Sequence, residues 1–328
     1  MTAESGGPAG EQPRPRAVMY IYSQTGQLRD VADALTAPLE ASGWDIRRVD
    51  VTPRIPFPFP WSLRSFFGVF PPSADPEALV ELVEPVDGFD SAPDELVILC
   101  YQVWFLAPSL PIRSLLKKHP EVVRDRRVIS LIACRNMWYS AAIEFAGLLR
   151  SAGARSVEVV AATDTQPQSA SLVTTLRWLL TGHREPFLGF GRAGVGEDEL
   201  ARVADVGRHI AETTRCPPDA APIVPKLAAA DLVGGRAFRR WGALVRSAER
   251  FGAVGRAVIL TLFVINLSVA IVVVFPLVAA VALVGGTRFE KRIQAFLRPR
   301  FAVGRPATAG ATLTEFYAPE EAGVDSGS

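Results

Sequence analysis

A short polar loop near the start of the chain has the residue types that bind a phosphate group. Its six residues are Ser23, Gln24, Thr25, Gly26, Gln27 and Leu28. The loop joins an apolar run to a stretch with helical spacing, so its backbone N–H groups are expected to converge at a helix N-terminus. Two small hydroxyls and a glycine that permits close backbone approach suit that role. The alternative is that Ser23 and Thr25 only cap the helix, as such residues do without a ligand.

Two further segments combine flat rings with hydrogen-bonding side chains. The first holds Gln102, Val103, Trp104 and Phe105, and the second holds Cys134, Arg135, Asn136, Met137 and Trp138. The amides of Gln102 and Asn136 can hydrogen-bond the polar edge of a planar heterocycle, and the aromatic residues provide surfaces for its ring. The alternative is that the tryptophans seal the rim of the core.

Buried strands must position these three segments. Apolar, β-rich runs predict strands over Ala17–Tyr22, Trp44–Val51, Glu95–Tyr101, Arg127–Ala133 and Ser156–Ala162. Helical spacing follows the first strand and recurs over Ser140–Ser151 and Glu197–Thr213. Buried strands that alternate with helices predict a doubly wound, parallel, five-stranded α/β sheet with helices on both faces. The three segments then lie at the carboxyl ends of their strands, where such folds bind ligands.

The segment SQTGQL resembles the phosphate loop of the flavodoxin-like family, TxTGxT, with Ser23 and Leu28 in place of the outer threonines. The resemblance implies the strand order 2-1-3-4-5 and FMN as the cofactor. It places the phosphate on this loop and the isoalloxazine ring between the other two segments, where Arg135 could offset negative charge on the reduced flavin. Leu28 removes one of the three hydroxyl groups of the family loop.

Five motifs together resemble a narrower group of bacterial flavodoxin-like proteins, the dialkylresorcinol condensing enzymes. They are YSQTGQL, PFPFPW at Pro56–Trp61, YQVWF at Tyr101–Phe105, CRNMW at Cys134–Trp138 and LRWLLTG at Leu176–Gly182. The resemblance spans roughly Ala17–Thr214 and implies a lipid-like substrate, with aromatisation of a cyclohexanedione precursor of aryl lipids as the presumed role of the group.

Two insertions interrupt the predicted sheet, Ile55–Pro72 and Asp164–Arg192. The first is crowded with phenylalanines, too many for a solvated loop, so it is expected to pack over something apolar. That partner is a ligand tail, the membrane or the core of the domain. We expect the insertion to face the bilayer and to admit lipid-soluble substrate.

The C-terminal third departs from the sheet pattern. The composition predicts a disordered head (1–15), a flavin domain (16–215), a Pro-rich linker (216–227), a basic amphipathic helix (228–255), a hydrophobic membrane segment (256–287) and a basic, then disordered tail (288–328). The basic helix either lies on the membrane surface or is an ordinary solvated helix. Because the sheet is complete before the linker, a chain ending near Pro225 is expected to be soluble.

Ala257–Gly286 runs thirty residues without a charge, whereas about twenty apolar residues cross a bilayer as a helix. Arginines flank the segment on both sides, so the positive-inside rule does not orient it. A tilted single span and a re-entrant hairpin that turns near Pro276 both fit. Met1–Pro15 has no apolar stretch typical of a signal peptide, so we expect the flavin domain in the cytoplasm, at the cytoplasmic membrane.

Composition narrows the function classes. The 35 Lys+Arg and 34 Asp+Glu leave a net charge of +1, which argues against a nucleic-acid partner. Three scattered cysteines predict neither a disulfide framework nor a metal site. The three histidines are expected at surface or capping positions and Cys134 is expected to be inert, so no catalytic residue is assigned.

The sequence therefore predicts a membrane-tethered, FMN-binding oxidoreductase that acts on a hydrophobic small molecule, with membrane lipid and a redox partner as further contacts. The alternative is a flavodoxin-like electron carrier or interaction module without an activity of its own. Such carriers are typically small and acidic, whereas this chain is neutral and has aromatic insertions.

Overall fold

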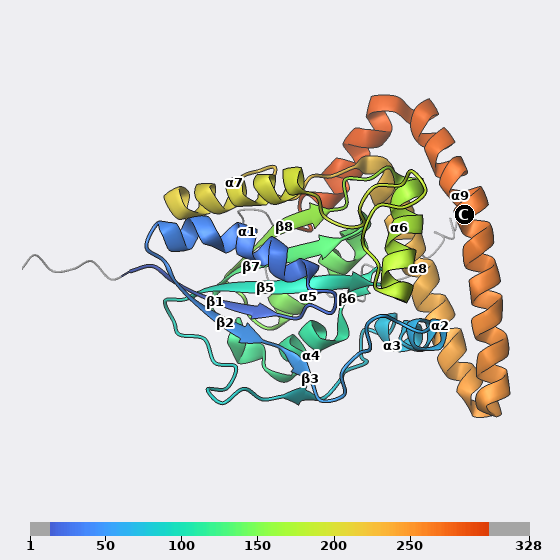
Figure 1. Ribbon diagram of the computed structural model, residues 1–328, viewed down its shortest axis with the longest axis horizontal. Coiled ribbons are helices and arrows are strands. Elements are labelled where there is room, and N and C mark those ends of the chain that lie inside the picture. The colour runs from blue at the N-terminus through green and yellow to red at the C-terminus, as the bar shows by residue number, and fades with distance from the viewer. Residues whose placement is uncertain (1–13, 302–328) are drawn as a thin grey trace, which may run out of the picture.

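Five parallel strands form the centre of the molecule (Figure 1). The structure is a computed structural model that describes residues 14–301, except for the side chains of residues 168–169, 274–276, 278–279 and 281–284. The strands are β1 (Arg16–Ile21), β2 (Asp45–Asp50), β5 (Leu96–Trp104), β7 (Arg127–Cys134) and β8 (Ser156–Thr163). They pair in the order β2-β1-β5-β7-β8, which is the predicted order 2-1-3-4-5 among these five. The predicted head and most of the predicted tail lie outside the described residues.

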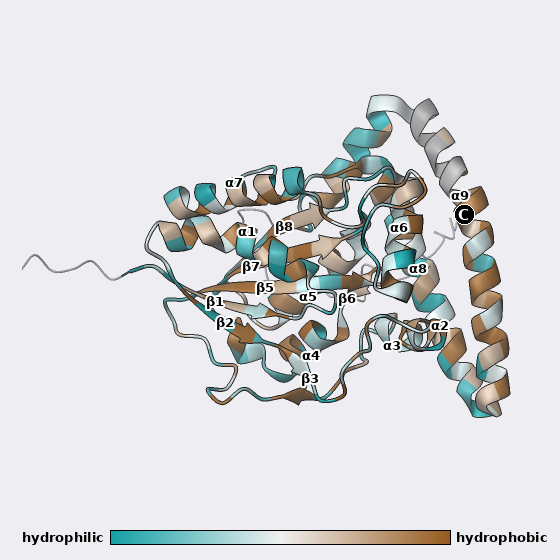
Figure 2. Cartoon of the chain, in the orientation of Figure 1, coloured by the Kyte–Doolittle hydropathy of each residue, from teal (hydrophilic) through white to brown (hydrophobic). Residues whose placement is uncertain are grey.

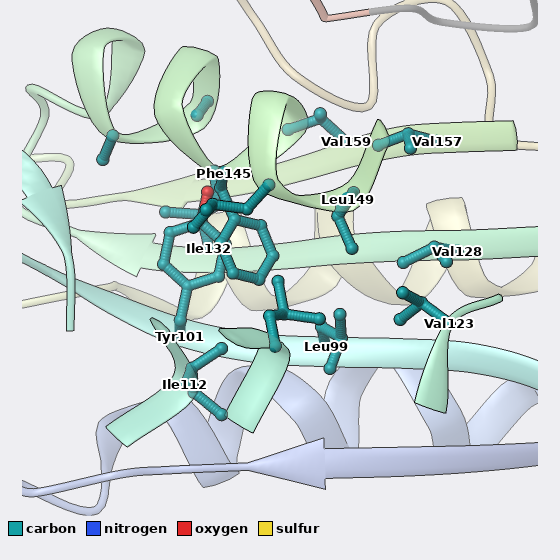
Figure 3. Packing of buried hydrophobic residues seen from close by; sticks show 14 of the residues in the cluster. Leu99, Tyr101, Ile112, Val123, Val128, Ile132, Phe145, Leu149, Val157 and Val159 are labelled. Atoms are coloured by element: carbon teal, nitrogen blue, oxygen red, sulfur yellow. The ribbon is translucent and has the colours of Figure 1, made fainter. Parts of the chain in front are cut away.

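Helices cover both faces of this sheet. On one face α1 (Gln27–Ala41) and α7 (Glu197–Thr213) pack side by side, and the other face carries α4 (Leu110–Lys118) and α5 (Tyr139–Ser151). Successive side chains of a strand point to opposite faces. Val18 and Tyr20 of β1 therefore join the core beneath α4 and α5, whereas Met19 joins the core beneath α1. Figure 3 shows the first of these cores, built from aliphatic side chains around Tyr101 and Phe145.

Shorter elements lie in the connections. They are β3 (Thr52–Pro53) and β4 (Leu82–Val83), which pair antiparallel, α2 (Leu63–Gly68), α3 (Phe70–Ser73), β6 (Ala107–Pro108), the 3-10 turn η1 (Pro120–Val122) and α6 (Gln168–Thr181). Strand β5 is longer than expected, because it continues past Tyr101 and pairs with β6 in a hairpin. Gln102, Val103 and Trp104 therefore lie in a strand and not in a loop.

The predicted Pro-rich linker is packed against the domain. Cys216 and Ala220 are buried, and the Ala220 carbonyl accepts a hydrogen bond from the Ala161 N–H of edge strand β8. Helix α8 (Pro225–Ala248) already begins at Pro225, because proline suits the first position of a helix. The 3-10 turn η2 (Glu249–Phe251) and α9 (Gly252–Leu297) follow, so both predicted boundaries of the basic helix shift toward the N-terminus.

Helix α8 belongs to the domain, which corrects the expectation of a basic helix on the membrane surface or in solvent. Its small residues allow close packing: a Cβ atom on Gly235 would lie 2.5 Å from the hydroxyl oxygen of Ser140 on α5. Two of its arginines point inward and form ion pairs, Arg239 with Glu144 at 2.6 Å and Arg246 with Asp75 at 3.2 Å. Two of the arginines that suggested a membrane-facing helix therefore hold α8 against the domain.

The apolar segment forms most of α9, which runs along one side of the molecule (Figures 1 and 2). By length and composition one helical segment among the described residues, Pro225–Val273, could cross a membrane. The backbone of α9 leaves helical geometry at Gly286, with φ 48°, beyond the predicted turn near Pro276. The chain then returns to the domain, where Leu297 and Phe301 are buried. A domain that ends near Pro225 would lack these residues, so the structure argues against the predicted soluble fragment.

The aromatic insertion packs within the protein. Phe70 is fully buried, and its ring stacks on Phe263 of α9 with centroids 3.9 Å apart. Phe66 contacts Phe105 of the β5–β6 hairpin at 5.1 Å. Of the three partners considered for this insertion, the core of the domain is one that it contacts, and Phe70 adds a contact with α9. Contact with a bilayer stays a prediction, since Ile55 and Leu63 of the insertion are exposed.

Candidate functional site

The three predicted segments meet at the carboxyl edge of the sheet. They follow or end β1, β5 and β7, which are neighbours in the order β1-β5-β7. Adjacent strands lie about 4.8 Å apart, so the ends of β1 and β7 are separated by roughly 10 Å with the end of β5 between them. The β1–β5 boundary is also the point where the strand order reverses, the usual ligand position in this architecture.

The loop after β1 leaves the N-terminus of α1 open to an anion. Gly26 adopts a left-handed conformation, with φ 83°, that a side chain would strain. It precedes the first turn of α1, whose N–H groups lack intrahelical partners and carry partial positive charge. The Ser23 hydroxyl is buried and has no hydrogen-bond partner within residues 14–301. These features fit a bound phosphate, which supplies acceptor oxygens and negative charge.

Gln102 holds this loop in place. Its Oε1 accepts from the Gln24 N–H at 3.1 Å, and its Nε2 donates to the Thr25 hydroxyl oxygen at 3.4 Å. The Gln24 side chain donates to the Pro58 carbonyl at 2.7 Å. Gln102 thus ties the β5 end to the β1 loop, and its amide already has partners there. This arrangement favours a positioning role over the expected contact with a ring edge.

Gln27 and Leu28, the last two residues of the predicted loop, face inward. Leu28 is fully buried in the core between α1 and the sheet. When the Gln27 amide is oriented so that its oxygen faces the neighbouring donors, this oxygen accepts from Arg184 Nη2 at 2.9 Å and from the Val195 N–H at 2.5 Å. Both therefore fix the start of α1. Neither side chain is turned toward a ligand at the loop.

Two residues outside the predicted site fix the second insertion: Arg184 holds it against α1, and Asp164 joins its start to Ser171 and Gly194. Arg184 contacts Gln27 and lies 3.6 Å from Asp30. Asp164, just after β8, accepts from the Ser171 hydroxyl at 3.1 Å and from the Gly194 N–H at 3.1 Å. The position of Asp164 after a buried strand was a signal that could have identified it, whereas Arg184 lies in an irregular segment without one.

The Trp104 ring is the centre of an aromatic cluster. Edge-on contacts join it to Phe57 at 4.8 Å, Tyr22 at 5.7 Å and Trp61 at 5.9 Å between centroids. Trp104 keeps part of its surface exposed, so it remains available to a ligand. Phe105 instead packs on Phe66 and Phe70, at 5.1 Å each, within the insertion.

The β5–β6 hairpin that presents these rings is strained. Phe105 and Leu106 both have positive φ, 49° and 61°, without being glycine. Such residues cost about 1–3 kcal/mol each and persist only where surrounding contacts impose them. Here the contacts of Phe105 with Phe66, Phe70 and Phe238 supply the constraint. Val103 pairs with Pro108 in the same hairpin. Phe105 and Leu106 are the two central residues of a two-residue hairpin, a turn that favours positive φ at both positions.

The β7 segment contributes less than expected. Trp138 is 1% exposed, with Tyr139 at 4.4 Å and Phe301 at 5.0 Å between centroids, so it has no surface left for a ligand ring. This corrects its expected role in ring stacking. Burial raises the pKa of the Cys134 thiol far above its usual value, which agrees with an inert residue. Met137 is half-buried beside it.

Two polar residues remain at the end of β7. The Asn136 side chain is buried, and neither its Oδ1 nor its Nδ2 has a hydrogen-bond partner within residues 14–301. Arg135 is half-buried, and its carbonyl accepts from the Asp164 N–H at 2.9 Å. A buried amide that lacks partners is costly, so Asn136 is the residue of this segment that best fits a polar ligand.

The N-terminus of α5 already holds a carboxylate from the chain itself. Asp231 of α8 accepts from the Ser140 N–H at 2.8 Å and from the Tyr139 N–H at 3.1 Å. Burial raises the pKa of Asp231 to about 7, and the hydrogen bonds from Ser140 and Tyr139 oppose that rise. Because α5 is satisfied in this way, the N-terminus of α1 is a better anion site than that of α5.

A hollow adjoins the β1 loop. It has a volume of about 260 Å³, and its lining includes Tyr22, Ser23, Gln24, Arg29, Asp50 and Phe57. Arg29 and Asp50 form an ion pair of 2.7 Å at its rim. Its volume lies just below the range of about 300–1,000 Å³ typical of small-molecule sites. The hollow therefore accommodates part of a nucleotide-sized ligand.

Comparison with family models gave no match, and comparison with curated proteins gave none either. Among solved structures, an archaeal flavodoxin has 12% sequence identity and a TM-score of 0.34, over 60% of this chain and 96% of that chain. An NAD(P)H:quinone oxidoreductase from Methanothermobacter marburgensis has 13% identity and a TM-score of 0.32, over 60% of this chain and 98% of that chain. At these values the likenesses carry no argument about function. The strand order was established from the hydrogen-bonded pairing of the strands and does not depend on these comparisons.

Proposed function

We propose that the chain is an FMN-binding oxidoreductase that acts at the membrane on a hydrophobic small molecule. The observation that carries the proposal is the β1 loop: Gly26 opens the N-terminus of α1 at the strand-order switch, and the Ser23 hydroxyl beside it is buried without a partner among the described residues. An anionic group with acceptor oxygens would satisfy both features.

Different residues at the carboxyl edge of the sheet would hold different parts of FMN. The phosphate would be held by the amides of the β1 loop with the hydroxyls of Ser23 and Thr25. The Asn136 amide would hydrogen-bond a polar edge of the cofactor, and Trp104 would contact its ring. When bound, FMN supplies two-electron transfer as hydride. Gln102 would act indirectly, by holding Gln24 and Thr25 in position.

A hydrophobic substrate is supported by the surroundings of Trp104. The rings of Tyr22, Phe57 and Trp61 surround it; Tyr22 and Trp61 are buried, whereas Phe57 is half-buried and lines the hollow, so Phe57 is the apolar ring that remains accessible there. An aryl-lipid or dialkylresorcinol-type precursor, the substrate class that the motif resemblance implies, has rings and alkyl chains that suit such a surface. A redox partner would exchange electrons with the flavin between turnovers.

The second candidate is a flavodoxin-like electron carrier or interaction module. The small hollow and the buried Trp138 favour it, because they leave less room for a substrate beside a flavin. Flavin content and substrate turnover separate the candidates. A carrier would hold flavin without reducing or oxidising a hydrophobic compound, and an interaction module would hold none.

The test is an absorption spectrum of the full-length protein, purified in detergent with added FMN, and of the double variant Thr25→Ala with Gly26→Val. The double variant is expected to lose flavin, because it removes a hydroxyl and blocks backbone approach. Gly43→Val is the matched control, since Gly43 has a similar φ of 87° at the opposite end of α1. Full flavin retention by the double variant would refute the assignment of the loop, and a wild-type protein without flavin would favour the interaction module.

A further inference from the structure

Up to Leu267, helix α9 has an inner and an outer face. Phe263, Ile259 and Leu267 of the inner face pack with Phe70 and Val245 in one cluster. The outer face carries large apolar side chains that recur every three or four residues and are about half exposed or more: Val254, Val258, Leu262, Ile265, Val269 and Val272. At the end of this outer stripe the consecutive residues Ile271, Val272 and Val273 are all exposed, so the helix is apolar on more than one side there, which is unusual for a surface in contact with water only.

Two hydroxyl groups of α9 form hydrogen bonds within the helix, whereas the Asn266 side chain is exposed. The hydroxyls of Thr261 and Ser268 are exposed, yet each donates to the backbone carbonyl four residues earlier, Ala257 at 2.8 Å and Val264 at 3.0 Å. Such bonds satisfy hydroxyl groups where water is absent.

Exposed basic residues flank the apolar segment 257–286 on both sides. Arg250 lies at one end, and Arg288, Lys291 and Arg292 lie at the other. This distribution complements the anionic headgroups of a bilayer, because it places positive charge on either side of an apolar surface.

Both ends of α9 are anchored to the same domain. Near its start, Phe263 stacks on Phe70, and Arg256 Nη2 donates a hydrogen bond to the Gly68 carbonyl at 3.5 Å. Beyond the bend at Gly286, Leu297 and Phe301 are buried in the core that contains Trp138. A helix that crossed the hydrocarbon core, about 30 Å thick, would carry one of these anchors to the far side of the membrane. The two anchors therefore oppose a transmembrane span.

From these observations we infer that α9 lies in the plane of a lipid bilayer with its outer stripe in the acyl–headgroup boundary and both of its ends on the same side. This inference deepens the membrane part of the proposed function and is independent of flavin binding. The two anchors oppose the single span, and the helical backbone of α9 up to Gly286 opposes a re-entrant hairpin that turns near Pro276. The occupant of the stripe is lipid, and negatively charged lipid strengthens the attachment through the basic ends.

Vesicle flotation tests the occupant. After removal of detergent, the full-length protein is expected to float with phosphatidylcholine vesicles that contain phosphatidylglycerol. For the double variant Ile265→Glu with Val269→Glu, the floating fraction is expected to be at least tenfold smaller. Val86→Glu is the matched control, because Val86 is a fully exposed apolar residue of the domain outside α9. Equal flotation of the double variant and the control would overturn the inference. The inference would also be overturned if the protein formed a stable dimer in solution that did not bind vesicles, and if the double variant were monomeric.

Cysteine labelling tests the topology and does not depend on the glutamate variants. Val254→Cys and Thr287→Cys place exposed thiols at the two ends of the apolar segment. The native cysteines are buried or half-buried, so the unmodified chain serves as the background control. In sealed membrane vesicles from the expressing cells, a membrane-impermeant maleimide is expected to label both positions from the same side. Labelling from opposite sides would establish a span and overturn the inference. Flavin content of the same preparations separates a failure here from a failure of the proposed function.

Discussion

Glu144 on α5 is a charged centre that joins three helices, and its replacement tests whether α8 is part of the domain. The carboxylate is fully buried and lies 2.9 Å from Arg113 Nε of α4 and 2.6 Å from Arg239 Nη2 of α8. Arg113 is itself buried and donates to the carbonyls of Ser73 at 2.8 Å and Asp75 at 2.7 Å. Glu144→Gln keeps the shape of the side chain and leaves two guanidinium groups without their shared counter-charge.

Removing one member of a buried ion pair costs about 3–5 kcal/mol, because the remaining charge stays desolvated. We expect Glu144→Gln to lower the free energy of unfolding by about that amount. Arg239→Gln is expected to cost less, about 1–3 kcal/mol, since it removes one charged hydrogen bond and leaves the pair of Arg113 and Glu144 intact. Chemical denaturation followed by tryptophan fluorescence in detergent measures both values.

A second readout follows α8 directly. Limited proteolysis is expected to cut Arg239→Gln between the sheet and α8 sooner than the unmodified protein, because the Arg239 contact helps to hold α8 on α5. A loss below about 1 kcal/mol in Glu144→Gln would refute the reasoning, since it would mean that solvent reaches the site. It would also restore the prediction of a solvated basic helix.

Asp231 gives a pH dependence. Its pKa is raised by burial from 3.8 to about 7, so the folded state binds more protons in that window and the free energy of unfolding is expected to fall as pH rises from 3.8 to about 7. The fall is roughly 4 kcal/mol at about 1.4 kcal/mol per pKa unit. Asp231→Asn is expected to abolish this contribution to the pH dependence of the free energy of unfolding, measured by denaturation at several pH values. An unchanged pH dependence in Asp231→Asn would contradict the prediction. A chain that ends at Pro225 is expected to aggregate or unfold, because it exposes Tyr139 and Trp138 and removes Arg239 from Glu144. A soluble fragment with a cooperative thermal transition would show that the sheet folds without α8 and α9.

The strand pattern was readable because β1, β5, β7 and β8 are buried on both faces and must therefore be apolar along most of their length. The predicted strands agree with the structure to within one or two residues at most ends, and the predicted strand order agrees with the observed pairing. The β5 extension was missed because Gln102 and Trp104 are not periodic with the preceding run. Gln102 pairs with Ala133 of β7, and the pairing of Trp104 depends on β6, which comes later in the chain.

The loop at Ser23–Leu28 could be located from the sequence because it is local: hydroxyls, glycine and the start of a helix lie within six residues. The partners of its side chains could not be located in this way. Gln102 reaches Gln24 and Thr25 across the β1–β5 boundary, and Arg184 reaches Gln27 from the second insertion. These contacts join residues that are far apart in the chain, so their spacing carries no signal.

The sequence by itself determined the apolar character of 257–286 and the basic character of its flanks, because composition is visible without a fold. Only the tertiary structure decided how these parts are used. Asp231 caps α5, Arg239 neutralises Glu144, and Phe301 covers Trp138 after the bend at Gly286. The physical reason is that helix dipoles, buried charges and exposed aromatic faces are satisfied by whichever segment reaches them, and only the folded chain shows which segment that is.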